Sequence, residues 1–290
     1  MIQRVLVYLP YINELATRLR IKRVQRYNCY KMGIPKPYKR IYRPVNPILP
    51  NAGYSSWAYI IDKDYCKSGH NYVRAFLLIL EDLEKLFEYI EPSTESFNSF
   101  SFRIHELFMR TCIEIEANFK AILIENDYKP DKDRFDNPIY NIRVYKRVNY
   151  SHHLSEYEVG LPQWSTSELI KFKPFEAWAH DNQPLEWYQA YNMSKHDRQD
   201  NFGYANLSNL LQAVSGLLCL IHSQFRGENF SPSDWGIGAE GFDFYDMESS
   251  TGGVFRIKEP SNWTEDELYD FNWSELKNEE VRFQKYDYNK

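Results

Sequence analysis

The sequence predicts a mainly α-helical protein, with an antiparallel four-helix core and irregular or short-β arms at both ends. Three observations predict this fold class. Apolar residues recur at three- and four-residue steps along four long segments, which is the period of an amphipathic helix. Proline or glycine interrupts the chain outside those segments. Glycine is scarce, with 12 in 290 residues, which argues against a turn-dense β-barrel.

The chain divides into an N-terminal arm (1–69), a helical core domain (70–226) with a mixed insertion (126–182), and a C-terminal extension (227–290). Charge follows this division. Residues 1–50 hold eleven basic residues and one acid, whereas the extension holds fifteen acids against six bases. A basic arm and an acidic extension could bind nucleic acid, or the two ends could bind each other, and the sequence leaves both explanations open.

The N-terminal arm interleaves cations with tyrosines in RVQRYNCYKMGIPKPYKRIYRP, residues 23–44. Tyrosine rings can stack on unpaired bases while cations hold phosphates, so this stretch is a candidate nucleic-acid binding segment. The alternative is an arm whose tyrosines pack against the acidic extension. The prolines from Pro35 to Pro50 exclude a helix and favour extended backbone. After them, residues 54–65 (YSSWAYIIDKDY) predict a short strand, because they are aromatic and β-branched.

The first two core helices are predicted at residues 71–90 and 97–125. Pro92 and Ser93 separate them, and so short a link favours an antiparallel pair. The apolar stripe of the first helix consists of Val73, Phe76, Leu77, Leu80, Leu83, Leu86, Phe87 and Ile90. The stripe of the second consists of Ile104, Phe108, Cys112, Ile115, Phe119 and Ile122. We expect both stripes to face a common core.

The last two core helices are predicted at residues 184–198 and 205–225. Pro184 suits the first turn of a helix, because the N–H it lacks has no partner there. The fourth helix is the most apolar and presents Leu207, Leu210, Leu211, Val214, Leu217, Leu218 and Ile221. In the insertion that precedes them, residues 137–148 (NPIYNIRVYKRV) are the best strand candidate.

The C-terminal extension predicts turns and short strands over residues 231–260, which combine glycines with alternating aromatic residues. Residues 262–276 (NWTEDELYDFNWSEL) predict one or two short helices. Thr264 and Ser274 are the candidate N-caps of those helices.

Several protein classes are excluded by missing patterns. The four cysteines never form a CxxC pair, and two lie in apolar helical segments, as small core residues in a reducing compartment do. The first residues lack the order of a signal peptide, and no apolar run reaches the ~18 residues of a membrane helix. We therefore expect a cytoplasmic protein with no membrane partner. Neither GxGxxG nor GxxxxGK[ST] occurs, and no ligand set stands at metal-binding spacing, so we expect no cofactor and no metal site.

The third predicted helix carries a polar ribbon. Asn192 and His196 are four residues apart with Lys195 between them, and Tyr188 and Gln199 extend the ribbon by one turn at each end. His196 can act as an acid or a base near neutral pH. Asn192 can orient a ribose or a phosphate by hydrogen bonding, and Lys195 and Gln199 can bind substrate. This set suits metal-independent RNA cleavage, in which a base activates the 2′-hydroxyl.

Two further residues of this helix complete the candidate site. Arg198 could hold a phosphate with its guanidinium fork, although it lies on another face if the helix continues past it. Tyr191 lies on a neighbouring face and is a candidate substrate contact. The alternative is structural: Asn192 and His196 satisfy backbone groups at a helix end, where the dipole favours cations.

The second predicted helix offers a partner ribbon of Arg103, Glu106, Arg110 and Glu114. Arg110 is a candidate catalytic cation if it faces His196 across a helix pair or a dimer interface. The alternative is an exposed face with ion pairs at helical spacing, each contributing ~0.2–0.5 kcal/mol.

The stretch YNMSKHDR (191–198), with RTCIEIEANFKAI (110–122) on the preceding helix, resembles the HEPN superfamily. The resemblance covers about residues 70–226 and implies an all-helical, dimeric protein. Many HEPN proteins are metal-independent ribonucleases of prokaryotic defence or toxin systems. His196 corresponds to the motif histidine and Asn192 to the polar residue four before it. Where the family's motif has an arginine this chain has Tyr191, so the resemblance requires Arg198 or Arg110 to supply the cation.

The resemblance therefore implies an HEPN-like homodimer that binds RNA or cleaves it without a metal. The alternative is a non-catalytic protein-interaction or dimerisation module, in which the polar ribbon fixes helix packing and the arms bind a protein partner. Nucleic-acid binding by the N-terminal arm alone is a third possibility, and it predicts a steep dependence of affinity on salt.

Overall fold

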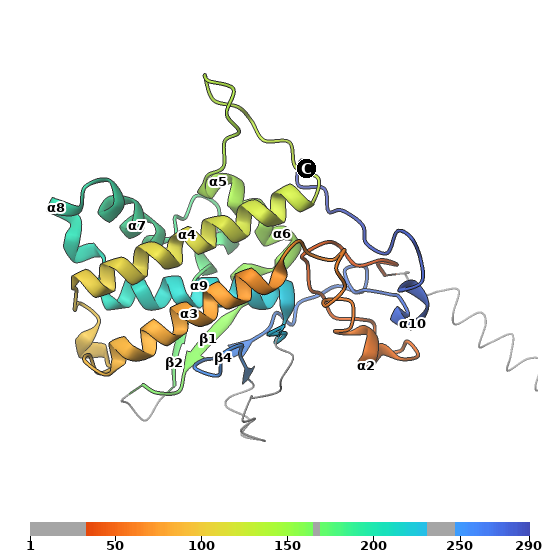
Figure 1. The fold of residues 1–290 in the computed structure, drawn as a ribbon, viewed down its shortest axis with the longest axis horizontal. Coiled ribbons are helices and arrows are strands. Elements are labelled where there is room, and N and C mark those ends of the chain that lie inside the picture. The colour runs from red at the N-terminus through yellow and green to blue at the C-terminus, as the bar shows by residue number, and fades with distance from the viewer. Residues whose placement is uncertain (1–32, 165–168, 231–246) are drawn as a thin grey trace, which may run out of the picture.

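The structure is a computed structural model that describes residues 33–164, 169–230 and 247–290. Four long helices dominate it (Figure 1): α3 (Gly69–Phe87), α4 (Phe102–Glu125), α7 (Glu186–His196) and α9 (Leu207–Phe225). They confirm the four helices predicted from the apolar period, with shifted ends. A small antiparallel sheet accompanies them, so the described fold is mainly α.

Side-chain caps decide where two of these helices begin. The hydroxyl of Ser101 accepts a hydrogen bond from the N–H of Ile104 at 3.2 Å, so α4 starts one residue after Ser101 and not at residue 97. In the same way Asn206 Oδ1 accepts from the N–H of Asn209 at 3.0 Å and starts α9. Apolar spacing alone does not show these starts, because the caps lie outside the stripes.

Helices α4 and α9 form a parallel pair at the centre of the core. At one end the N–H of Leu207 donates to the carbonyl of Ser99 at 2.9 Å. At the other end Gln224 Nε2 donates to Asn118 Oδ1 at 3.0 Å. Helices α3 and α7 each contact both members of this pair and run in the opposite direction (Figure 1). Almost every residue of α9 is therefore buried, which explains why it is the most apolar helix.

The sheet has the strand order β2-β1-β4-β3, with all neighbours antiparallel. Its strands are β1 (Glu158–Leu161), β2 (Ile170–Phe172), β3 (Glu248–Ser249) and β4 (Arg256–Lys258). In the central pairing Val159 lies opposite Ile257. The insertion supplies β1 and β2 and the extension supplies β3 and β4, so the sheet joins these two regions. The short strands predicted within 231–260 are confirmed at β3 and β4, and residues 231–246 lie outside the described part.

The strand predicted at residues 54–65 is wrong. The chain forms the short helix α2 (Ala52–Ser55) and then a series of turns. Asp62 Oδ1 accepts from the N–H of Asp64 at 2.9 Å, which closes one of these turns. Tyr59 and Tyr65 are both buried, and their rings meet edge to face with centroids 5.4 Å apart. The aromatic composition of this stretch therefore reflects burial on a folded turn and not β-pairing.

The strand predicted at residues 137–148 is also wrong. The chain forms α5 (Ile142–Tyr145), which continues into the 3₁₀ helix η2 (Lys146–Val148). Asn141 Oδ1 accepts from two backbone N–H groups of the first turn, at 3.1 and 3.2 Å, and caps this helix. Tyr145 and Val148 are buried three residues apart, and the Tyr145 ring stacks on Phe119 of α4 at 5.0 Å. Packing on α4 overrides the β-propensity of this stretch.

Short helices occupy several connections. They are η1 (Thr94–Ser96), α6 (Asn149–His152), η3 (Leu154–Glu156), η4 (Glu176–Ala179), α8 (Arg198–Asn201), η5 (Phe202–Tyr204) and α10 (Trp273–Leu276). The helix α10 confirms a short helix within 262–276. Its cap is not Ser274 as predicted: Asn272 Oδ1 accepts from the N–H of Ser274 at 3.0 Å. The Thr264 hydroxyl donates to the carboxylate of Glu267 at 2.9 Å and caps none of the described helices.

The described part of the N-terminal arm lies along the C-terminal extension. Isolated β-bridges join Ile34 and Val45 to Tyr269, and Lys36 Nζ contacts the Glu279 carboxylate at 2.6 Å. For this part of the arm, binding to the extension is the explanation that the structure supports. The predicted nucleic-acid role of residues 1–32 lies outside the described residues.

Two arginines of the arm are buried. Arg40 is fully buried and places its guanidinium 4.4 Å from the centre of the Tyr72 ring. Arg43 is 3% exposed and lies 5.3 to 5.8 Å from the rings of Tyr38, Trp263 and Tyr286. Both therefore hold the arm in place and are not available to a nucleic acid. Within the described ranges, no helix has the length and apolar character needed to cross a membrane.

Candidate functional site

The polar ribbon of the third core helix is interrupted by a break in that helix. Helix α7 stops at His196, and Asp197 leaves the helical conformation with φ −140° and ψ 79°. The Asp197 side chain then caps α8 by accepting from the N–H of Asp200 at 3.3 Å. The helix was predicted to continue to Arg198, which would put that residue on another face. The break instead lets Arg198 share a groove with the end of α7.

A shallow groove of about 530 Å³ lies between α4 and the α7–α8 segment. Its lining residues are Tyr191, Ser194, Lys195, His196 and Arg198 from α7 and α8, and His105, Met109 and Ile113 from α4. Four predicted site residues, Tyr191, Lys195, His196 and Arg198, therefore meet at one place. None of the described residues that line this groove is a carboxylate, so its fixed charges are positive.

Tyr191 positions Lys195 at the groove. The tyrosine ring is buried, with its centroid 6.3 Å from that of Phe108 and 5.5 Å from that of Tyr188. Lys195 Nζ donates a hydrogen bond to the Tyr191 hydroxyl at 3.0 Å. Burial raises the pKa of Tyr191, and the hydrogen bond to Tyr191 raises the pKa of Lys195. The hydroxyl therefore stays neutral and the amine stays charged, so Tyr191 acts by holding a cation.

His105 is a groove residue that the sequence patterns did not single out. It lies half-buried on α4, and its Nε2 atom is buried without a hydrogen-bond partner among the described residues. Its ring centroid lies 5.7 Å from that of Phe202. The four-residue spacing of His105, Met109 and Ile113, beside the core stripe, is the signal that could have found it. His105 brings a second imidazole to the groove.

Asn192 and Gln199 do not line the groove. Asn192 is half-buried on α7, and Gln199 is exposed on α8. Tyr188, at the other end of the ribbon, is buried and donates to Glu116 at 2.7 Å. Because the helix breaks at Asp197, Gln199 no longer lies on the same helix face as His196. The ribbon expected on one continuous helix is therefore divided.

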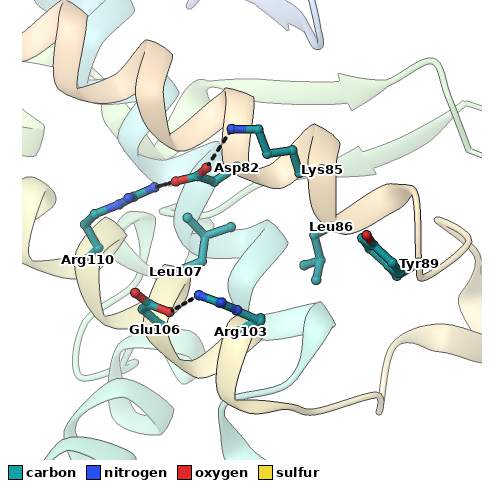
Figure 2. A pocket seen from close by; sticks show the side chains of 8 residues that line it. All are labelled: Asp82, Lys85, Leu86, Tyr89, Arg103, Glu106, Leu107 and Arg110. Carbon is teal, nitrogen blue, oxygen red and sulfur yellow. Dashed lines mark hydrogen bonds and ion pairs between the residues drawn. The ribbon is translucent and has the colours of Figure 1, made fainter.

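Arg110 faces α3 and not α7 (Figure 2). Its Nη2 atom donates to Asp82 Oδ2 at 2.6 Å, in a pocket of about 240 Å³ between α3 and α4. In the same pocket Arg103 pairs with Glu106 at 3.1 Å. The hydrogen bond from Arg110 holds the pKa of Asp82 below its ordinary range. Within one chain, Arg110 thus forms an interhelical ion pair and does not meet His196.

A second polar cluster joins the end of α9 to the chain beyond β4. His222 is 1% exposed, and its Nε2 atom lies 2.7 Å from the carboxylate of Glu259, which is also 3.6 Å from Arg226 Nε. Burial alone would raise the pKa of Glu259, but His222 and Arg226 hold it below its ordinary value. Arg226 supplies the fixed positive charge beside the Glu259 carboxylate, so we interpret the cluster as structural. In the part of the chain that the structure covers, no group of three or more His, Cys, Asp or Glu side chains is placed to hold a metal ion.

The α4–α7 groove combines two imidazoles with two fixed cations. An imidazole can accept or donate a proton near neutral pH. Arg198 can bind two phosphate oxygens with its planar fork, and Lys195 can act as a point charge. These groups can together bind a phosphodiester and transfer protons beside it.

Comparisons of the chain with protein-family models, with curated protein sequences and with solved structures found no match in any of the three. A function can therefore be inferred only from the chemistry of the groove and from the packing of the helices.

Proposed function

We propose that this protein is an HEPN-like RNA-binding protein that cleaves RNA without a metal ion in the groove between α4 and α7–α8. The observation that carries this proposal is the convergence of His105, His196, Lys195 and Arg198 on one groove. The four long helices, with α7 leading into the apolar α9, support an HEPN-like core. A ribonuclease of this kind fits the prokaryotic defence and toxin systems in which HEPN proteins are widespread.

The proposed reaction uses both histidines. One imidazole removes the proton of an RNA 2′-hydroxyl, and the 2′-oxygen then attacks the adjacent phosphorus. The other imidazole gives a proton to the 5′-oxygen as its bond to phosphorus breaks. Lys195 and Arg198 stabilise the negative charge that gathers on the phosphate oxygens. The products are a 2′,3′-cyclic phosphate and a 5′-hydroxyl, and no water is consumed in this step.

The test is the cleavage of a labelled RNA that contains both paired and unpaired segments. We expect His196→Ala and His105→Ala each to reduce the rate by ~10²–10⁴, because each removes an acid or base. His70→Ala is the matched control: His70 is an exposed histidine near the start of α3 and does not line the groove. It is expected to cleave like the wild type. The reaction should continue in the presence of EDTA and should leave cyclic phosphate ends.

Equal cleavage by the wild type and His196→Ala would mean that the groove does not carry the reaction. Absence of cleavage in both proteins would remove the catalytic part of the proposal. RNA binding without cleavage would then remain to be measured at the same groove. Thermal unfolding of each variant separates a lost catalytic group from a lost fold.

A second candidate function is homodimerisation through the same groove. The observation that favours it is the apolar wall formed by Met109 and Ile113, since Ile113 is 55% exposed although it lies beside the core stripe. In this case Ile113→Glu should convert a dimer to a monomer in light scattering, and His196→Ala should have no nucleic-acid phenotype.

A further inference from the structure

We infer that an unpaired RNA base stacks on an exposed aromatic platform beside the groove, and this inference rests on the proposed function. The aromatic platform consists of Phe100, Phe102 and Phe202. Phe100 is 54% exposed and Phe102 is 66% exposed. Phe202 is half-buried between them, with its ring centroid 5.5 Å from that of Phe100 and 4.8 Å from that of Phe102. Three rings thus form one continuous apolar surface.

The aromatic platform is continuous with the groove. The guanidinium of Arg198 lies 5.6 Å from the centre of the Phe102 ring, and the His105 ring lies 5.7 Å from that of Phe202. Arg198 and His105 both line the groove. A nucleotide whose phosphate is held by Arg198 therefore has an aromatic surface within reach of its base.

The backbone under the aromatic platform is held rigidly. Ser101 caps α4 between the two exposed phenylalanines, and the N–H of Leu207 donates to the carbonyl of Ser99 at 2.9 Å. Figure 1 shows α8 and the first turns of α4 and α9 at the same end of the core, away from α2 and α10. The rings are thus placed before any ligand arrives, which lowers the entropy cost of binding.

The surrounding charges favour a nucleic acid as the occupant. Arg198 lies beside the platform and Lys195 lines the adjoining groove, while two acidic side chains of the same elements have partners. Asp197 caps α8, and Glu106 pairs with Arg103 at 3.1 Å. A single strand combines flat apolar bases with an anionic backbone and therefore matches both parts of this surface. A duplex conceals the faces of its bases, so the substrate class is single-stranded RNA.

The experiment measures binding separately from cleavage. The probe is a labelled single-stranded RNA with 2′-O-methyl riboses, which lacks the attacking hydroxyl, and the readout is fluorescence anisotropy with the full-length protein. We expect Phe102→Leu to weaken binding by about ten-fold or more, because each stacked base contributes strongly to affinity. A duplex of the same sequence is expected to bind more weakly, and its affinity should not change in Phe102→Leu.

The matched control is Phe135→Leu. Phe135 is 69% exposed and has the Arg134 guanidinium 4.7 Å from its ring centre, but it lies in the chain between α4 and α5, away from the groove. This variant loses the same arginine–phenylalanine pairing at another place. Its affinity for the probe should stay within about two-fold of the wild type, as for most surface substitutions.

The outcomes separate the inference from the proposed function. If both variants bind like the wild type, or both weaken equally, the aromatic platform has no role, while RNA cleavage in the groove stands. If the wild type does not bind the probe, the inference fails together with RNA recognition at the groove. If Phe102→Leu changes the oligomeric state in light scattering, the platform is an interface between copies of the chain and the inference is overturned.

Discussion

Arg40 and Glu125 form a largely buried ion pair that ties the N-terminal arm to the end of the central helix α4. The distance from Arg40 Nε to Glu125 Oε1 is 2.7 Å, and the arginine side chain is fully buried. A second guanidinium nitrogen, Nη1, donates to Gln224 Oε1 of α9 at 2.7 Å. The other carboxylate oxygen of Glu125 accepts from the N–H of Lys67 at 2.9 Å. One arginine thus joins the arm to both helices of the central pair.

Replacing Arg40 by methionine should destabilise the protein by about 3–5 kcal/mol, because Glu125, whose side chain is only 17% exposed, would lose the cation that pairs with it. Urea unfolding measures the loss. Lys36→Met is the matched control, since the ion pair of Lys36 with Glu279 is partly exposed and contributes about 0–1 kcal/mol. Similar losses in the two variants would show that burial does not set the strength of the Arg40 contact.

The stability of the protein should depend on pH through His152. This histidine is fully buried, with Nε2 2.9 Å from the carbonyl of Arg40 and Nδ1 2.8 Å from the Ser151 hydroxyl. Burial lowers the pKa of His152 to about 3, whereas the unfolded chain has a histidine pKa of about 6.5. Between those values the unfolded chain binds a proton that the folded chain does not. The free energy of unfolding therefore falls as the pH falls, by up to about 1.4 kcal/mol per pH unit.

The comparison with His152→Gln isolates this effect. Urea unfolding of both proteins at pH 7, 6, 5 and 4 gives their difference in stability. The advantage of the wild type should shrink at each step towards acid, because glutamine does not titrate. A difference that stays constant with pH would show that His152 is protonated equally in the folded and unfolded chains.

The two candidate arginines should behave differently on substitution. Arg198→Gln is expected to reduce RNA cleavage by ~10²–10³, because it removes a cation from the groove, and to leave unfolding unchanged. Arg110→Gln is expected to leave cleavage unchanged. It should lower the free energy of unfolding by less than about 1 kcal/mol, since the ion pair of Arg110 with Asp82 is partly exposed. The reverse result would place Arg110 at the reacting phosphate, which requires a second chain.

The loop between β3 and β4 should tolerate substitution at one glycine better than at its neighbour. Gly252 and Gly253 have φ values of 84° and 74°, so alanine at either position adopts a conformation that costs about 1–2 kcal/mol. A Cβ atom on Gly252 would also overlap Leu80 and lie 3.2 Å from Leu77 of α3, whereas one on Gly253 meets no atom within 4 Å. Gly252→Ala should therefore lower the free energy of unfolding by about 1–3 kcal/mol more than Gly253→Ala does, as measured by thermal or urea unfolding. Equal losses would mean that the loop moves away from α3 without cost.

The long helices could be predicted because the apolar period is a local signal. The sequence could not predict which helices pack against one another in the core. It also could not predict the strands β1 and β2. Val159 of β1 pairs with Ile257 of β4, which is far away in the sequence, and the pairing leaves no alternating pattern in so short a strand. The stretches 54–65 and 137–148 have strand-like composition for another reason, since their aromatic and β-branched side chains pack on turns and on α4.

The candidate site could be predicted in part. Lys195 and His196 follow from helical spacing, because they lie on one turn of α7. Arg198 joins them only because Asp197 breaks the helix and caps the next one. His105 joins them from a helix about 90 residues earlier in the chain. Helical spacing identifies the residues that share a face of one helix, but it does not show which residues a neighbouring helix adds to the site.

The sequence by itself determined the four helices, their buried faces and the polar end of α7, because residues three and four apart share a helix face whatever surrounds them. Only the tertiary structure decided which polar groups come together: Arg110 pairs with Asp82, Arg40 pairs with Glu125, and His196 lines one groove with His105. The physical reason is that ion pairs and grooves depend on the orientation of elements that are distant in the chain. That orientation is set by packing the apolar faces together, and no local pattern records it.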